Sequence, residues 1–171
     1  FEYSRNSVAY NPETGAEVSK NKPVYVPFAA GKLGSLMVEE TENLIAEVDS
    51  EEYIRTAGDN NFAYWVCYSG LEKSTTYTIS FEAEFLEGQS DYITILPYRM
   101  AGQQMSQIHI PYSSECRMTA TFTTDDRYNY NLLIYAGRAG QTAGNRIKFK
   151  KTQLEKLSYS TPWHIGGGTR A

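Results

Sequence analysis

The stretch "YTISFEAEF" (77–85) decides the fold class, because apolar and polar side chains alternate along it without a break. Its odd positions are apolar, and its even positions carry Thr, Ser or Glu. A period of two is typical of a strand with one face on a core and the other in water. The stretch therefore predicts a half-buried antiparallel strand.

Similar runs continue outward from this strand. "RMTATFTT" (117–124), "SQIHIPY" (106–112) and "NRIKFKK" (145–151) alternate, whereas "FAYWVCY" (62–68), "DYITILPYR" (91–99) and "NLLIYAG" (131–137) are more apolar and indicate central strands. Polar turn signals such as "GDNN" (58–61) and "LEGQSD" (86–91) separate them. Short, evenly spaced strands predict an all-β fold, an antiparallel β-sandwich of the jelly-roll type. The best helical candidate, "EETENLIAEV" (39–48), is short.

The first 50 residues have a different composition. "NKPVYVPFAAGKLGS" (21–35) holds two prolines and two glycines between apolar residues. We expect an extended N-terminal arm over residues 1–50, which lies either on the sandwich or on a neighbouring subunit. The sandwich is expected over residues 51–165, and a flexible tail over residues 166–171.

Bulk composition excludes some partners and leaves one question open. The 171 residues carry a net charge of −4 and no basic patch, so nucleic acid is not an expected partner. No apolar run approaches the length of a membrane span, so no membrane is expected either.

The two cysteines, Cys67 and Cys116, lie in runs that predict strands, and we expect small buried side chains there. Whether they pair stays open.

In the strand that begins at residue 145, the inward-facing residues change from odd to even positions near Lys150–Lys151. Ile147 and Phe149 face inward at odd positions, but Leu154, the next strong apolar residue, is at an even position. One extra residue, a β-bulge, would restore the pattern. Pro162 then prevents further pairing, and we expect Trp163 to fold back as a lid on the open end of the sandwich.

Three segments carry a resemblance to a known family. "NRIKFKKTQLEKLSYSTPW" (145–163) resembles the last strand and tail of carbohydrate-binding-module-like jelly rolls in bacteriophage tail proteins, although Leu157 stands where glycine is usual. "LEKSTTYTISFEAE" (71–84) and "GKLGSLMVEETENLI" (31–45) are similar to further segments of such virion proteins. The resemblance spans Tyr10 to Trp163 and implies a jelly-roll fold in a phage particle. The matching tail residues are Gln153, Leu154, Glu155, Lys156, Thr161, Pro162 and Trp163.

The resemblance also implies a structural Ca²⁺, because jelly rolls of this kind often hold one. Calcium takes six to eight oxygen ligands. The segments "DSEE" (49–52) and "GDNN" (58–61) could supply them through Asp49, Glu51 and Asp59. The alternative interpretation is ordinary turn chemistry, and no other cofactor is expected.

The sequence offers little support for catalysis. His109 alternates with two isoleucines and faces away from their core, and His164 lies in the tail. There is no G-x-S-x-G segment. Glu82 and Glu84 share one strand face about 7 Å apart, so a glycosidase pair is conceivable. Their outward row is also what any solvated strand shows, and we expect no enzyme.

Flat aromatic faces beside planar hydrogen-bonding side chains are what a saccharide site needs. Two segments, "LPYRMAGQQMSQIHIPY" (96–112) and "DDRYNYN" (125–131), combine both. A tyrosine-rich surface also suits a protein–protein interface, and some of these tyrosines could belong to the core. The candidate saccharide-binding residues are Tyr98, Arg99, Gln103, Gln104, Gln107, Tyr112, Arg127 and Tyr128.

The leading hypothesis is a non-enzymatic virion module of a phage tail, baseplate or capsid surface that binds a saccharide of the bacterial cell surface. The alternative is a purely structural decoration or assembly protein, held to neighbouring subunits by its N-terminal arm and without a glycan ligand. Other virion subunits are expected partners in both. A homo-oligomer is expected only by analogy with tail proteins.

Overall fold

The computed structural model describes residues 9–10, 17–18 and 41–168. The chain forms two units, Phe1–Glu40 and Thr41–Ala171. In the first unit, β1 (Ala9–Tyr10) pairs antiparallel with β2 (Glu17–Val18). The other residues of the predicted arm up to residue 40, and residues 169–171 of the predicted tail, lie outside the described residues.

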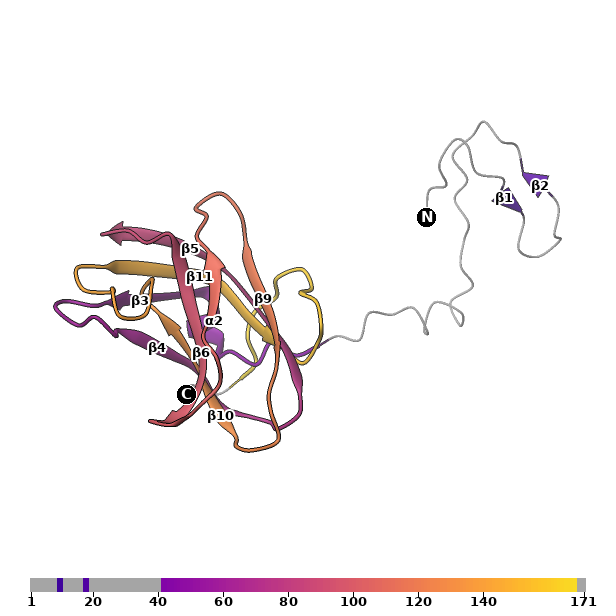
Figure 1. Cartoon of the computed structure of the whole chain (residues 1–171). Coiled ribbons are helices and arrows are strands. Elements are labelled where there is room, and N and C mark those ends of the chain that lie inside the picture. Colours follow the sequence, from indigo (N-terminus) through magenta and orange to yellow (C-terminus); the bar gives the residue numbers. More distant parts are fainter. Residues whose placement is uncertain (1–8, 11–16, 19–40, 169–171) are drawn as a thin grey trace. The chain divides into compact units, whose positions relative to one another are not determined.

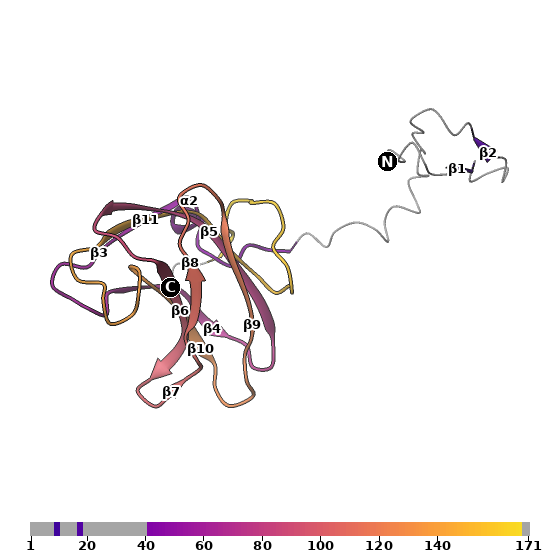
Figure 2. The same cartoon turned by 45° about the horizontal axis from the view of Figure 1, so that its top comes forward.

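Two antiparallel sheets make up the second unit (Figure 1). The first sheet has the order β3-β11-β5-β9, and the second has the order β4-β10-β6. The strands β8 and β7 both pair with β6, β8 with its first half and β7 with its end (Figure 2). The bounds of the first sheet are β3 (Glu52–Thr56), β11 (Arg146–Glu155), β5 (Thr76–Glu87) and β9 (Met118–Thr123). Those of the second are β4 (Tyr64–Leu71), β10 (Tyr130–Tyr135), β6 (Tyr92–Met100), β7 (Gln103–Gln104) and β8 (Ile108–Pro111).

The core lies between the two sheets and confirms the predicted β-sandwich. The odd-numbered residues of "YTISFEAEF" face it as predicted, and Tyr77, Ile79 and Phe81 are fully buried. Aromatic rings cross from sheet to sheet: Trp65 of β4 stacks on Tyr53 of β3, with 4.2 Å between ring centroids. Fully burying one large apolar side chain contributes about 1.5–3 kcal/mol, so this core is the main source of stability.

The predicted β-bulge is present. The pairing of β11 with β5 shifts register between Lys150 and Gln153, and Lys151 has a φ of 48°. The shift returns Leu154 to the core, where it is fully buried. As a result, the side chains of Gln153 and Glu155 point to the outer face of the first sheet, where they bond to other segments of the chain.

The outer face of the first sheet is covered around Thr78 and Ser80 rather than solvated along its whole length. Thr78 and Ser80, which alternation predicts to face water, are 1% and 0% exposed. The hydroxyl of Thr78 donates to the carbonyl oxygen of Leu157, and Arg117 donates to Ser80. The backbone N–H of His164 donates to Oε1 of Gln153 on β11. The tail therefore lies over the outer face of this sheet, so the prediction of a lid on the open end was wrong.

The boundaries predicted for the sandwich were too narrow at both ends. Ile45, assigned to the arm, is fully buried in the core, and the compact unit begins at Thr41. Gly166 and Gly168, assigned to a flexible tail, bond to Ser50 and Ile45. The predicted helix over 39–48 was also wrong: the described helix is α2 (Glu47–Glu51).

The two cysteines have different environments. Cys67 on β4 is buried, as predicted, and burial raises the pKa of its thiol. Cys116 is exposed in the segment before β9, because that segment is a bend and not a strand. Both thiols are free, so the question of their pairing is answered.

Candidate functional site

The outer face of the second sheet carries an apolar cluster of its own, separate from the core. Leu96 of β6 and Leu133 of β10 are Cα partners and point away from the sandwich interior, yet both are only 2% exposed. Tyr135 is buried beside them, and Val66, Tyr98 and Ala139 pack against the group. Aromatic side chains thus cover leucines on a face that strand alternation assigns to the outside.

Three tyrosines define this face, and we call them the tyrosine platform: Tyr64, Tyr98 and Tyr135. Tyr64 and Tyr135 are directly opposite each other on β4 and β10, and their rings meet edge to face at 5.8 Å. Tyr64 is 40% exposed, so its ring is accessible to a ligand. Burial raises the pKa of Tyr135, and the hydroxyls of Tyr64 and Tyr98 raise it further. The raised pKa keeps the hydroxyl of Tyr135 neutral at physiological pH.

Amide side chains lie beside the platform. Asn131 of β10 and Gln104 of β7 are the Cα partners of Tyr98 on its two sides. Residues directly opposite in neighbouring strands project to the same face of a sheet. Gln104 is exposed and Asn131 half-buried, so both offer donors and acceptors next to the Tyr98 ring.

A second group of rings lies toward the start of β6 on the same face. Tyr92 packs against His109 of β8 with 4.6 Å between the ring centroids. The guanidinium of Arg138 stands 5.2 Å from the centroid of the Tyr92 ring. His109 faces away from the core, as predicted, and its Nδ1 is 3.4 Å from the hydroxyl of Thr94. Residues 92, 94, 96 and 98 therefore present one continuous outer row along β6.

The structure brings only part of the sequence-predicted saccharide site together. Tyr98 and Gln104 belong to the outer face described above. Arg99 follows Tyr98 in the strand and points the other way, with its guanidinium 5.3 Å from the ring of Tyr128. Arg127 approaches the same ring at 6.0 Å.

The remaining predicted residues lie apart from the platform. Gln103 pairs with Met100 at the tip of β6, and Gln107 is exposed before β8. Tyr112 follows the far end of β8, where its ring meets Phe85 of β5 edge to face at 4.9 Å.

Asp125 organises the loop that carries Arg127 and Tyr128. Its carboxylate accepts hydrogen bonds from the Tyr130 hydroxyl and from the side chain and backbone N–H of Arg127. Burial alone would raise the pKa of Asp125, but these bonds outweigh it and lower the pKa. Arg127 is thus neutralised locally, which makes it a structural cation rather than a free ligand contact.

Sequence reasoning missed Tyr64, Tyr135, Tyr92, Asn131 and Arg138. The strands "FAYWVCY" and "NLLIYAG" are apolar at nearly every position, so they indicate burial on both faces. Their outward residues become visible as a group only when the register of β4, β10 and β6 is known. The signal that could have found them is the parity of Tyr64 and Tyr135 relative to the core residues Trp65 and Ile134.

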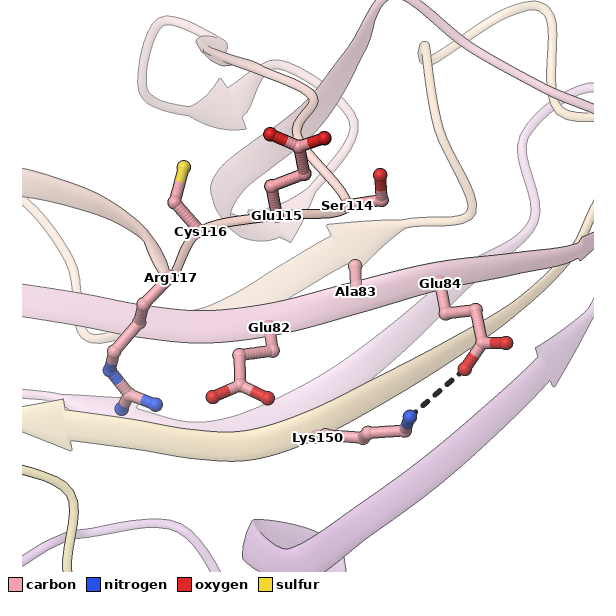
Figure 3. Close-up of a pocket in the computed structure, with 8 residues that line it drawn as sticks. All are labelled: Glu82, Ala83, Glu84, Ser114, Glu115, Cys116, Arg117 and Lys150. Atoms are coloured by element: carbon pink, nitrogen blue, oxygen red, sulfur yellow. Dashed lines mark hydrogen bonds and ion pairs between the residues drawn. The ribbon is translucent and has the colours of Figure 1, made fainter.

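The carboxylates considered for glycoside hydrolysis line a hollow of about 420 Å³ on β5 (Figure 3). Figure 3 shows Glu82 and Glu84 on one side of the strand, with the ammonium of Lys150 beside Glu84. Lys150 lowers the pKa of Glu84 through a 2.9 Å hydrogen bond, and Lys151 pairs with Glu82. A general acid needs a raised pKa at neutral pH, so the shift at Glu84 has the wrong direction.

The candidate calcium ligands are not gathered into a cluster. Asp49 is buried in α2, whereas Glu51 and Asp59 are exposed. Among residues 41–168, no group of three or more His, Cys, Asp or Glu side chains could hold a metal ion. The structural calcium ion stays a prediction.

No helix in the described ranges has the length and apolar character to cross a membrane.

Comparisons with known proteins add little to this geometry. No protein-family model and no curated protein sequence matches the chain. One similar solved structure holds the CBM22-1 and GH10 modules of endo-1,4-β-D-xylanase 10B from Clostridium thermocellum, complexed with xylohexaose. The identity is 10% and the TM-score 0.38, over 72% of this chain and 29% of that one. This chain therefore spans less than a third of the length of that one.

Proposed function

We propose that this protein is a non-catalytic binding module whose outer face on the second sheet holds a saccharide. The observation that carries the proposal is the tyrosine platform, in which Tyr98 and Tyr135 pack with Leu96 and Leu133 outside the core and Tyr64 meets Tyr135 edge to face. A separate apolar cluster on an outward sheet face contributes nothing to the packing between the sheets. Its exposed rim, where Tyr64 is 40% exposed, is the part that a ligand or partner can reach.

The chemistry of the platform suits a sugar ring. The C–H groups of a sugar pack against an aromatic face, while its hydroxyls need hydrogen-bonding groups at the edge. Tyr98 offers the ring, and Asn131 and Gln104 on either side offer amide donors and acceptors. Rings held by buried leucines lose little conformational freedom on binding, which favours affinity.

The proposed setting is the surface of a phage particle, where the ligand is a saccharide of the bacterial cell surface. The three sequence segments that resemble phage tail proteins support this setting. Attachment to other virion subunits belongs to the same proposal. The face and the setting are separate claims, because a saccharide can bind the platform in any biological context.

The test is binding of the full chain to intact bacterial cells and to their isolated cell-wall saccharides. Tyr64→Ala and Tyr98→Ala should each weaken binding about tenfold or more, since losing about 1.4 kcal/mol of contact energy corresponds to a factor of ten. The matched control is Tyr159→Ala, because Tyr159 is also an exposed tyrosine (54%) but lies in the tail segment over the first sheet. Unchanged binding in both platform variants would overturn the proposal.

A further inference from the structure

The two sheets differ in how their charges are arranged. In the described strands, the first sheet holds Glu52, Glu82, Glu84, Glu87 and Glu155 together with Arg55, Arg146, Lys148, Lys150 and Lys151. Most of these charges pair across neighbouring strands, as in Lys150–Glu84 and Arg146–Glu87. The first sheet therefore neutralises itself and presents no excess of one sign.

The second sheet carries no carboxylate in its described strands. Its titratable or charged groups other than tyrosine and the buried Cys67 are Arg99 and His109. This is notable in a chain with a net charge of −4. Strands without Asp or Glu do not repel an anion locally, although the rest of the molecule, including the exposed Asp91 just before β6, would.

Arg138 supplies the face with a cation that has no carboxylate partner among residues 41–168. It is exposed, and it lies over the ring of Tyr92. A guanidinium stacked on an aromatic ring keeps its N–H groups free at the edge, where they match the two oxygens of a carboxylate or phosphate. This position leaves Arg138 able to bind an anion beside the Tyr92 ring.

The backbone holds Arg138 close to the tyrosine platform. Its N–H donates to Oγ of Ser90, and the next N–H, of Ala139, donates to the hydroxyl of Thr94 on β6. Ala139 packs against the cluster of Leu96, Leu133 and Tyr135. Gly137 has a φ of 116°, and a β-carbon there would lie 2.9 Å from side-chain atoms of Ser90 and Asn145, so the loop cannot shift freely.

From this arrangement we propose that the saccharide bound by the outer face is anionic, with a carboxylate or phosphate group that pairs with Arg138 while its sugar rings lie on Tyr98 and Tyr64. This inference rests on the proposed function and names its ligand class. Tyr92, which Arg138 covers, and Tyr98 are about 20 Å apart along β6, from six residues at about 3.3 Å each, so a ligand that reaches both Arg138 and the Tyr98 ring spans several sugar units. The aromatic rings alone would bind anionic and neutral saccharides equally well. Charge complementarity then makes the face prefer the anionic ones.

The experiment measures binding of the full chain to polygalacturonate and to its fully methyl-esterified form, which has the same backbone without the charge. A poly(glycerol phosphate) polymer tests whether the anionic group that pairs with Arg138 can be a phosphate instead of a carboxylate. Polygalacturonate or the phosphate polymer should bind at least tenfold more tightly than the neutral ester, and the preference should shrink as salt rises from 20 to 300 mM. Arg138→Gln should abolish the preference, whereas Arg146→Gln on the first sheet should leave it unchanged.

Each other outcome overturns a defined part of the proposal. Equal binding of the acidic and neutral polymers overturns the anionic ligand and leaves the saccharide module standing. A preference for acidic polymers that survives Arg138→Gln removes Arg138 from the site. Failure of all three polymers, together with no binding to cell-wall saccharides, overturns both the ligand class and the proposed function. Displacement of polygalacturonate by a single-stranded oligonucleotide of equal charge would show that the face binds anionic polymers in general. That outcome would overturn the saccharide ligand.

Discussion

A β-carbon on Gly168 would lie 2.0 Å from the carbonyl oxygen of Leu44, so the two ends of the sandwich are in direct backbone contact. Gly168 donates to the carbonyl of Ile45 and forms a parallel bridge with Ala46. Asn43 reinforces the junction, because its side-chain amide donates to the carbonyls of Thr152 and His164. These contacts hold the first segment of the sandwich, residues 43–46, against its last, residues 164–168.

Gly166 is the best position for testing this junction. Its β-carbon would lie 2.0 Å from the carbonyl oxygen of Ile45, and its N–H bonds to the buried hydroxyl of Ser50. Gly166→Ala should lower the free energy of unfolding by about 1–3 kcal/mol, the usual cost of overpacking. Urea denaturation followed by tryptophan fluorescence measures the change.

The matched control is Gly167→Ala, one residue further on. A β-carbon on Gly167 meets only the side chain of Glu42, at 3.4 Å, which is ordinary contact. This variant should stay within about 0.5 kcal/mol of the parent protein. Equal losses in both variants would mean that the close approach at Gly166 is not the cause, since the effect of alanine on the entropy of the unfolded chain would stabilise both.

Glu155 should make the stability of the protein depend on pH. Its buried carboxylate accepts hydrogen bonds from the hydroxyls of Thr41 and Thr161 and from the N–H of Thr161. Burial alone would raise the pKa of Glu155, but these bonds and one from Gln153 outweigh it and lower the pKa below its ordinary value of 4.5. The resulting stability is fully present above that value and is lost as the pH falls through the lowered pKa.

Glu155→Gln isolates this contribution, because one amide –NH₂ replaces an accepting oxygen. At pH 7 the variant should unfold about 1–3 kcal/mol more easily than the parent, the typical cost of a buried donor left without a partner. The difference should shrink as the pH falls from about 4.5 through the lowered pKa, since the parent carboxylate becomes protonated over that range. Urea denaturation of both proteins between pH 3 and 7 measures it, and a constant difference across that range would contradict the assignment.

Tyr112 should behave as a core residue and not as a ligand contact. Its ring packs against Phe85 and the edge of the core, away from the tyrosine platform. Tyr112→Ala should cost about 1–3 kcal/mol of unfolding free energy, less than for a fully buried ring, and should leave saccharide affinity unchanged below the melting range. Loss of binding at unchanged stability would instead support the sequence-based assignment of Tyr112 to the site.

The two cysteines should differ sharply in reactivity. Burial raises the pKa of the Cys67 thiol, and its sulfur lies 3.5 Å from the carbonyl oxygen of Leu132, so it is neither ionised nor accessible. Ellman's reagent should therefore titrate one thiol in the native protein and two in the unfolded protein. Cys116→Ser should reduce the native value to zero, and two reactive thiols in the folded parent would show that β4 opens readily.

The strands and the bulge could be predicted from the sequence because both depend on local parity. Side chains of a strand alternate whatever its neighbours are, so "YTISFEAEF" assigns Phe81 inward on its own. The displaced parity of Leu154 likewise requires one extra residue near Lys151. Such statements compare residues only a few positions apart.

What covers each outward face was decided by the tertiary structure alone. Thr78 and Ser80 follow the same outward pattern as a solvated row, yet a tail about 80 residues later buries them, as the bond from Thr78 to Leu157 shows. Alternation reports which side of a sheet a residue takes, but not what lies on that side. The predicted lid, arm boundary and flexible tail were wrong for this reason.

The sequence by itself determined a β-sandwich, its core strands and the bulge in the last strand, because hydrophobic periodicity is a local property of the chain. Only the tertiary structure assembled Tyr64, Tyr98 and Tyr135 into one platform and placed Arg138 at its end. Tyr64 lies 34 positions before Tyr98, and Tyr98 lies 37 positions before Tyr135, so the pairing register of β4, β10 and β6 is what brings the three together. Register is a long-range property set by packing and ladder hydrogen bonds, so no single stretch of sequence reveals it.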